Sequence, residues 1–135
     1  MIISIVIVED TDNERDRLIR IVNKGVAELT LHLAGNFKDA ETLLTGFKDK
    51  NIDLILLDID LGINKMSGIE AVKAIRKISN NVKIIMCTKF TENNKIILSL
   101  ALGANGYIEK TIGEDRILQA ITDVMNGRTI ISPAI

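Results

Sequence analysis

Apolar positions along this chain follow two patterns, short continuous runs typical of buried strands and stripes at the spacing of a helix. Residues 2–8 are apolar at every position but one, the pattern of a short strand that is covered on both faces. The segment that follows has a different period, because Leu18, Ile19, Ile21 and Val22 form an apolar stripe at helical spacing. The chain is therefore predicted to begin with a strand followed by a helix.

Local capping signals predict where this helix begins and ends. Glu14 follows Thr11 by three residues, the spacing of a capping box in which each side chain satisfies a backbone N–H group of the first turn. Gly25 comes shortly after the apolar stripe, and glycine commonly ends a helix. We expect a helix that begins after Thr11 and ends near Gly25.

The same alternation of strands and helices continues through the chain. Four further strands are expected, over residues 29–35, 52–57 and 82–87 and in a short segment that ends at Lys110. Four further helices are expected, over residues 38–49, from Gly68 to Ile78, from a cap at Thr91 through Ala101, and from Ile117 to Met125. The total is five strands and five helices in strict alternation.

This order of elements predicts a single parallel sheet. A helical crossover returns the chain to the same end of the sheet, so consecutive strands run parallel and helices cover both faces. Right-handed crossovers leave two strand orders open. Residues 29–35 alternate leucine with threonine, histidine and alanine, which indicates a half-exposed strand at an edge and favours the order 2-1-3-4-5.

Composition is consistent with one globular domain of a cytoplasmic protein. The chain has 135 residues, of which 47% are apolar and 26% charged, enough to bury a core without disulfides or structural metal. Its net charge of −1 argues against a surface that grips nucleic acid. Cys87 is the single cysteine, which excludes an internal disulfide and fits a reducing compartment. We expect no membrane segment, because no apolar run is long enough to cross a bilayer and the first residues lack the features of a signal peptide.

Polar residues follow four of the predicted strands at the point where each strand ends. Glu9 and Asp10 follow the first strand, Asp58 the third, Thr88 the fourth, and Lys110 ends the fifth. Ligands of open parallel sheets bind at this edge, where the strand order reverses. Converging carboxylates call for a hard cation, and Mg²⁺ accepts both carboxylate and phosphate oxygens. The pattern predicts phosphoryl transfer, with Asp58 as the nucleophile that forms an acyl phosphate and with Thr88 and Lys110 as donors to the phosphoryl oxygens.

Each of these residues taken alone has an ordinary structural explanation. Thr88 would cap the following helix, and Lys110 would be a solvated surface charge. Glu9 and Asp10 would suit the positive end of the first helix. The joint pattern across four strands is much harder to obtain by chance, and it favours the chemical interpretation.

The sequence resembles the receiver domain of two-component response regulators, and in particular those of the LuxR or NarL type. The motifs that carry the resemblance are Val-Glu-Asp at 8–10, Leu-Ile-Leu-Leu-Asp at 54–58, Cys-Thr at 87–88 and Gly-Tyr-Ile-Glu-Lys at 106–110. The resemblance runs through residues 2–131 and implies a flavodoxin-like (CheY-like) fold.

The resemblance implies roles for the acidic residues. Asp58 would accept a phosphoryl group from the phosphohistidine of a sensor histidine kinase. Asp10 and Asp58 would bind Mg²⁺, the backbone carbonyl of Asp60 would be a third ligand, and Glu9 would assist through water. The protein would thereby catalyse its own phosphoryl transfer and dephosphorylation without being a conventional enzyme.

The resemblance also implies a switch and its partners. Phosphorylation would draw Thr88 toward the phosphoryl group, let Tyr107 turn inward, and pair Lys110 with the new charge. The face formed by the fourth helix, fifth strand and fifth helix would be a homodimer surface. Residues 1–127 would form the receiver domain and residues 128–135 would begin a linker to an absent helix-turn-helix output domain, through which alone the protein would bind DNA and regulate transcription.

Several positions depart from the family pattern. The loop between Asp58 and Gly68 is longer than usual, and Gly62 stands where the family has a proline. Lys89 replaces a small residue, and Thr111 stands where a proline commonly follows the lysine. These differences predict an altered phosphoryl lifetime rather than a loss of activity.

Two other functions compete with this interpretation. The pair Asp58 and Asp60 also resembles the nucleophile motif of haloacid-dehalogenase-type phosphatases, in which Asp60 would be the general acid and base. Those enzymes carry their metal-binding acids after the lysine, whereas here the acidic pair precedes Asp58, which favours the receiver. A pseudo-receiver that binds partners without phosphorylation is the third possibility, and the presence of Asp10, Asp58, Thr88 and Lys110 argues against it.

Overall fold

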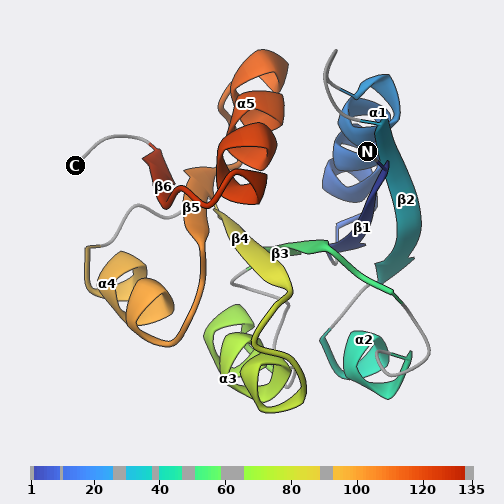
Figure 1. Ribbon diagram of the computed structural model, residues 1–135. Coiled ribbons are helices and arrows are strands. Elements are labelled where there is room, and N and C mark those ends of the chain that lie inside the picture. Colours follow the sequence, from blue (N-terminus) through green and yellow to red (C-terminus); the bar gives the residue numbers. More distant parts are fainter. Residues whose placement is uncertain are drawn as a thin grey trace.

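The computed structural model shows a parallel sheet with helices on both of its faces (Figure 1). It describes residues 2–9, 11–25, 30–37, 40–46, 51–58, 66–88 and 93–132. Within these ranges the sheet has six strands in the order β2-β1-β3-β4-β5-β6. The order of the first five strands and the edge position of β2 are as predicted.

The element bounds in the described ranges agree closely with the sequence pattern. The strands are β1 (Ile2–Val8), β2 (Thr30–Phe37), β3 (Leu54–Asp58), β4 (Lys83–Thr88), β5 (Gly106–Glu109) and β6 (Ile130–Ser132). The helices are α1 (Asp12–Lys24), α2 (Ala40–Gly46), α3 (Gly68–Ile78), α4 (Asn93–Ala101) and α5 (Glu114–Met125). None of these helices has the length and apolar character that crossing a membrane requires.

The sixth strand is a feature that the sequence pattern did not predict. Residues 130–132, expected at the start of a linker, run parallel to β5 with Ile130 opposite Gly106 and Ile131 opposite Tyr107. Two isoleucines are too short a run to be distinguished from a linker by periodicity. The segment that leaves α5 is thus attached to the edge of β5.

Side chains of the sheet alternate between two separate cores. Helices α1 and α5 cover one face, and α2, α3 and α4 cover the other (Figure 1). Ile7 of β1 belongs to the same buried cluster as Leu18 of α1 and Ile121 of α5. The next residue, Val8, belongs to the opposite cluster together with Val72 of α3. This alternation follows from the period of two in a strand, and it explains why strands covered on both faces are apolar throughout.

Helix α1 has the predicted ends but not the predicted capping box. Thr11 occupies the N-cap and Gly25, with a φ of 67°, the C-cap. The Thr11 side chain makes no capping hydrogen bond, and the Thr11 N–H donates to Glu9 Oε1 at 3.2 Å. The prediction of a Thr11–Glu14 capping box was therefore wrong, because the carboxylate of Glu9, the residue after β1, accepts the hydrogen bond from the Thr11 N–H that Glu14 would have accepted.

Arg76 of α3 joins the turn before β4 to the loop before β5. Its Nη1 donates to the carbonyl oxygens of Val82 and Ser79 at 2.7 and 3.1 Å. Its Nε and Nη2 donate to the Gly103 carbonyl at 3.0 and 2.8 Å, and Nη2 also donates to Asn105 Oδ1 at 2.9 Å. Burial lowers the pKa of the Arg76 guanidinium, but arginine stays charged in proteins. One side chain thus satisfies acceptors from two loops.

An Arg76→Met substitution is expected to reduce the free energy of unfolding by about 2 kcal/mol, because several part-buried acceptors lose a charged donor. Arg76→Lys is expected to recover only part of this loss, because an ammonium cannot reproduce the planar fork. Urea denaturation measures both. The matched control is Lys77→Met on an exposed position of the same helix. An Arg76→Met variant as stable as this control would contradict the structural role.

Candidate functional site

The strands that carry the predicted site end side by side at one edge of the sheet. Val8, the last residue of β1, lies opposite Leu57 of β3. Asp58, which ends β3, lies opposite Cys87 of β4. Glu9 therefore leaves β1 next to the position at which Asp58 ends β3. The register places these two acids at the point where the strand order reverses, as the sequence predicted.

The same edge continues across β4 and β5. Thr88, which ends β4, lies opposite Glu109, and the following Lys110 N–H donates to the Thr88 carbonyl at 2.7 Å. The side chains of Thr88 and Lys110 belong to residues that are only 1% and 6% exposed. Lys110 is thus not the solvated surface charge that it would be in isolation.

Glu9 and Lys110 form a buried ion pair at this edge. Glu9 is fully buried, and Lys110 Nζ lies 2.5 Å from Glu9 Oε2. The other oxygen of the carboxylate, Oε1, accepts the Thr11 N–H at 3.2 Å. A buried charge needs such a partner, because removal from water costs several kcal/mol per ion, by rough estimate. An ion pair therefore connects the residues that directly follow β1 and β5 at the predicted site.

Tyr107, the predicted switch residue, lies in the core. It is 1% exposed and belongs to the buried cluster beneath α3 and α4, which contains Ile96 and Ala104. In the register of the sheet it lies opposite Met86 of β4 and Ile131 of β6. The structure thus places the ring inside the fold on the strand that leads to Lys110.

Part of the predicted site lies outside the described residues. Asp10, Asp60 and Lys89 are outside the described residues, as is the predicted cap at Thr91. For Asp58 the structure describes the backbone but not the side chain. Within the described ranges, no group of three acids, histidines or cysteines has the arrangement of a metal site. The predicted Mg²⁺ ligands therefore remain a prediction. Glu9 fits its predicted role through water and not as a direct ligand, because its two carboxylate oxygens already contact the Thr11 N–H and the Lys110 ammonium.

Two arginines of α1 hold the loops of the site and were not predicted. Arg15 Nη1 donates to the Glu9 carbonyl at 3.0 Å. Arg17 Nη1 donates to the Lys110 carbonyl at 2.7 Å, and its Nη2 donates to the Ile112 carbonyl at 2.9 Å. Sequence reasoning missed these contacts because arginines beside an apolar stripe are typical of a solvated helix face. The one signal available was their position in the first half of the helix that follows the acidic pair.

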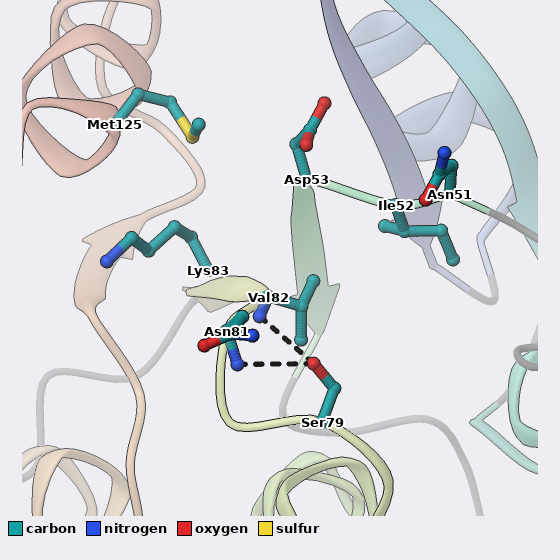
Figure 2. Close-up of a pocket in the computed structure, with 8 residues that line it drawn as sticks. All are labelled: Asn51, Ile52, Asp53, Ser79, Asn81, Val82, Lys83 and Met125. Atoms are coloured by element: carbon teal, nitrogen blue, oxygen red, sulfur yellow. Dashed lines mark hydrogen bonds between the residues drawn. The ribbon is translucent and has the colours of Figure 1, made fainter.

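A pocket of about 380 Å³ lies at the other end of the sheet, where β3 and β4 begin (Figure 2). It contains no predicted site residue. Within it the Ser79 hydroxyl accepts hydrogen bonds from the N–H groups of Asn81 and Val82, both at 3.2 Å. Asp53 accepts a hydrogen bond from the Ser4 N–H at 2.8 Å. These polar groups serve local turns and strand ends, so the predicted chemistry belongs to the opposite edge.

Comparison with known proteins supports the receiver interpretation. A family model described as "Response regulator receiver domain" matches residues 5–122. The transcriptional regulatory protein LnrK of Bacillus subtilis is 28% identical over 136 residues, which cover 97% of this chain and 57% of LnrK. The chemotaxis protein CheY of Thermotoga maritima is 29% identical over 120 residues, which cover 89% of this chain and 95% of CheY. This chain thus spans little more than half of the longer relative.

Solved structures show the same fold. A two-component response regulator of the LuxR family from Aurantimonas sp. SI85-9A1 superposes with a TM-score of 0.89 at 22% identity, covering 98% of this chain and 91% of that one. A CheY-like response regulator receiver domain protein from Methanospirillum hungatei superposes with a TM-score of 0.79 at 24% identity, covering 94% and 96%. At such identities the likeness establishes the fold, and the family model favours a receiver over a phosphatase of the dehalogenase type.

Proposed function

This chain belongs to the response regulator receiver domain family of two-component signal transduction, and we propose that Asp58 is the residue that accepts its phosphoryl group. Receivers of this family interact with histidine kinases and bind Mg²⁺ for phosphorylation. The observation that carries the assignment to Asp58 is the buried Glu9–Lys110 ion pair beside the end of β3. It supplies a fixed cation and a fixed carboxylate at the position where Asp58 leaves the sheet.

The proposed reaction transfers a phosphoryl group from a phosphohistidine of the kinase to Asp58. A carboxylate oxygen of Asp58 attacks phosphorus, the phosphorus–nitrogen bond breaks, and the imidazole leaves with a proton from solvent. Lys110 compensates charge on the phosphoryl oxygens, and the Thr88 hydroxyl donates to one of them. Asp10, Asp58 and the Asp60 carbonyl would hold Mg²⁺, with Glu9 acting through water, and the ion would supply further charge neutralisation.

The proposed output is a change in the surface near β5. The new negative charge attracts Thr88 and Lys110. Tyr107 lies on β5, the strand directly before Lys110, and its buried ring changes its packing in the core when Lys110 moves. A homodimer through α4, β5 and α5 is part of the proposal, since Ile97 and Leu98 of α4 are 66% and 46% exposed. A role in transcription rests on likeness to LnrK, whose name states that activity. A cytoplasmic location fits the single cysteine, which is buried and not part of a disulfide.

Phosphorylation of the purified chain by phosphoramidate tests the assignment. With Mg²⁺ present, we expect uptake of one phosphoryl group per chain, and we expect EDTA to abolish it because the acids at the site would then repel the anionic donor. Borohydride reduction followed by peptide mapping is expected to locate the adduct at Asp58. Uptake that ignores EDTA, or an adduct at any other residue, would exclude the proposed site.

A further inference from the structure

Helix α1 contacts both partners of the buried ion pair through their backbone. Arg15 donates to the carbonyl of Glu9, and Arg17 donates to the carbonyl of Lys110. Glu9 and Lys110 in turn meet through their side chains at 2.5 Å. The two arginines are two residues apart on one helix and reach two different loops. One rigid element thus fixes the backbone from which each charged side chain of the pair extends.

Arg17 makes the stronger of these two attachments. Its planar guanidinium bridges the carbonyl oxygens of Lys110 and Ile112 at 2.7 and 2.9 Å, so the residues on both sides of Thr111 are held by one side chain. Hydrogen bonds from a charged donor are roughly twice as strong as neutral ones. Both bonds span more than ninety residues of sequence, so they fix the loop relative to α1 and not merely within itself.

Two backbone N–H groups of this turn are also hydrogen-bonded. The Lys110 N–H donates to the Thr88 carbonyl at 2.7 Å, and the Ile112 N–H donates to the Glu109 carbonyl at 3.2 Å. Ile112 is 9% exposed and belongs to the core cluster under α1 and α5. Lys110 is therefore held from β4 on one side and from α1 on the other. Removal of Arg17 would release one of these two attachments.

The sequence of the loop explains why an external attachment matters. Thr111 stands where proline commonly follows the lysine, and a proline would fix its own φ angle. Threonine leaves that angle free, so the loop has more conformational freedom to lose on folding. A lysine side chain has four rotatable bonds between its backbone and its charge, so the ammonium keeps one position only where its backbone and the Glu9 carboxylate that it contacts are both held. The Arg17 bridge supplies the restraint that the sequence of the loop lacks.

We propose that Arg17 is a positioning residue, which holds the backbone of residues 110–112 so that the Lys110 ammonium stays on Glu9 and beside Asp58. Its effect on phosphoryl transfer rests on the proposed function. Charge stabilisation depends steeply on placement, and a displacement of about 1 Å can reduce a rate by up to about a hundredfold. We therefore expect Arg17 to control the rate of phosphorylation without contacting the phosphoryl group.

The test compares Arg17→Leu and Arg17→Lys with Lys24→Leu. The control also removes a cation from α1, but Lys24 is an exposed partner of Glu114 on α5 and does not reach the site. With saturating phosphoramidate and Mg²⁺, Arg17→Leu is expected to be phosphorylated about tenfold more slowly than wild type, and Arg17→Lys to recover little, because a single ammonium does not bridge two carbonyls. Mg²⁺ affinity by calorimetry is expected to be unchanged.

A second measurement separates positioning from stability. Nitrogen-15 NMR of the lysine ammonium groups is expected to show a slowly exchanging Lys110 signal in the wild type and in Lys24→Leu, and its loss in Arg17→Leu at a temperature where the variant is folded. An unchanged Lys110 signal, or a phosphorylation rate within about twofold of wild type, overturns the inference. If the wild type takes up no phosphoryl group, the proposed function is excluded instead. The comparison of the Lys110 ammonium signal between wild type and Arg17→Leu then tests the positioning role without the reaction.

Discussion

An Asp58→Asn chain is expected to take up no phosphoryl group from phosphoramidate under conditions in which the wild type is fully modified. The asparagine side chain has the same size, but its amide carries no charge, and its nitrogen lone pair is delocalised, so it cannot form the acyl phosphate. The residue ends β3, where its backbone continues the pairing with β4 at Cys87, and this pairing does not involve the side chain. Intact-mass spectrometry and retention on a phosphate-binding gel both report the loss.

The matched control for this substitution lies at the other end of the same strand. Asp53 precedes β3 at the opposite edge of the sheet and accepts the Ser4 N–H through its carboxylate, a contact that an asparagine oxygen retains. Asp53→Asn is expected to be phosphorylated like the wild type. Modification that survives in Asp58→Asn would assign the reaction to another acid. A wild type that is never modified would instead leave a binding module that works without phosphorylation.

The fold could be predicted because its signals are local and repeated. Residues 2–8 and 54–57 are apolar throughout, as strands with cores on both faces must be, and Gly25 ends α1 in the conformation that favours glycine. The placement of Glu9, Asp58, Thr88 and Lys110 at one edge of the sheet followed from the parallel topology alone, since each follows or ends a strand. These inferences need no knowledge of side-chain packing.

The contacts that hold the site could not be predicted in the same way. Arg17 bonds to carbonyl oxygens, and every residue has a carbonyl, so the partner residues carry no signature in the sequence. Arg76 joins two loops by the same kind of bond. The Glu9–Lys110 pair is an intermediate case, because the topology placed both residues at one edge but only the folded structure shows that they are buried and touching.

A Lys110→Met substitution is expected to reduce the free energy of unfolding by about 3 kcal/mol as well as to impair phosphorylation. Methionine fills a similar volume, so the loss comes from the electrostatics and not from a cavity. Glu9 is fully buried and its Oε2 contacts the Lys110 ammonium, so without the ammonium its charge has lost its compensation. Urea denaturation measures the change. Lys24→Met, which breaks an exposed ion pair with Glu114, is expected to cost less than about 0.5 kcal/mol.

A double-mutant cycle of Glu9→Gln and Lys110→Met tests whether the uncompensated charge of Glu9 causes the loss of stability in Lys110→Met. If it does, Glu9→Gln combined with Lys110→Met is expected to be more stable than Lys110→Met alone, because no uncompensated charge remains in the interior. If the lysine instead stabilises the fold through packing of its methylene groups, the two substitutions add and the double variant is the least stable. The Lys110→Met variant and the double variant are both expected to be phosphorylated slowly, since each lacks the Lys110 ammonium. Stability and phosphorylation therefore depend on the same ion pair, but removal of the Glu9 charge from Lys110→Met is expected to restore stability and not the rate of phosphorylation.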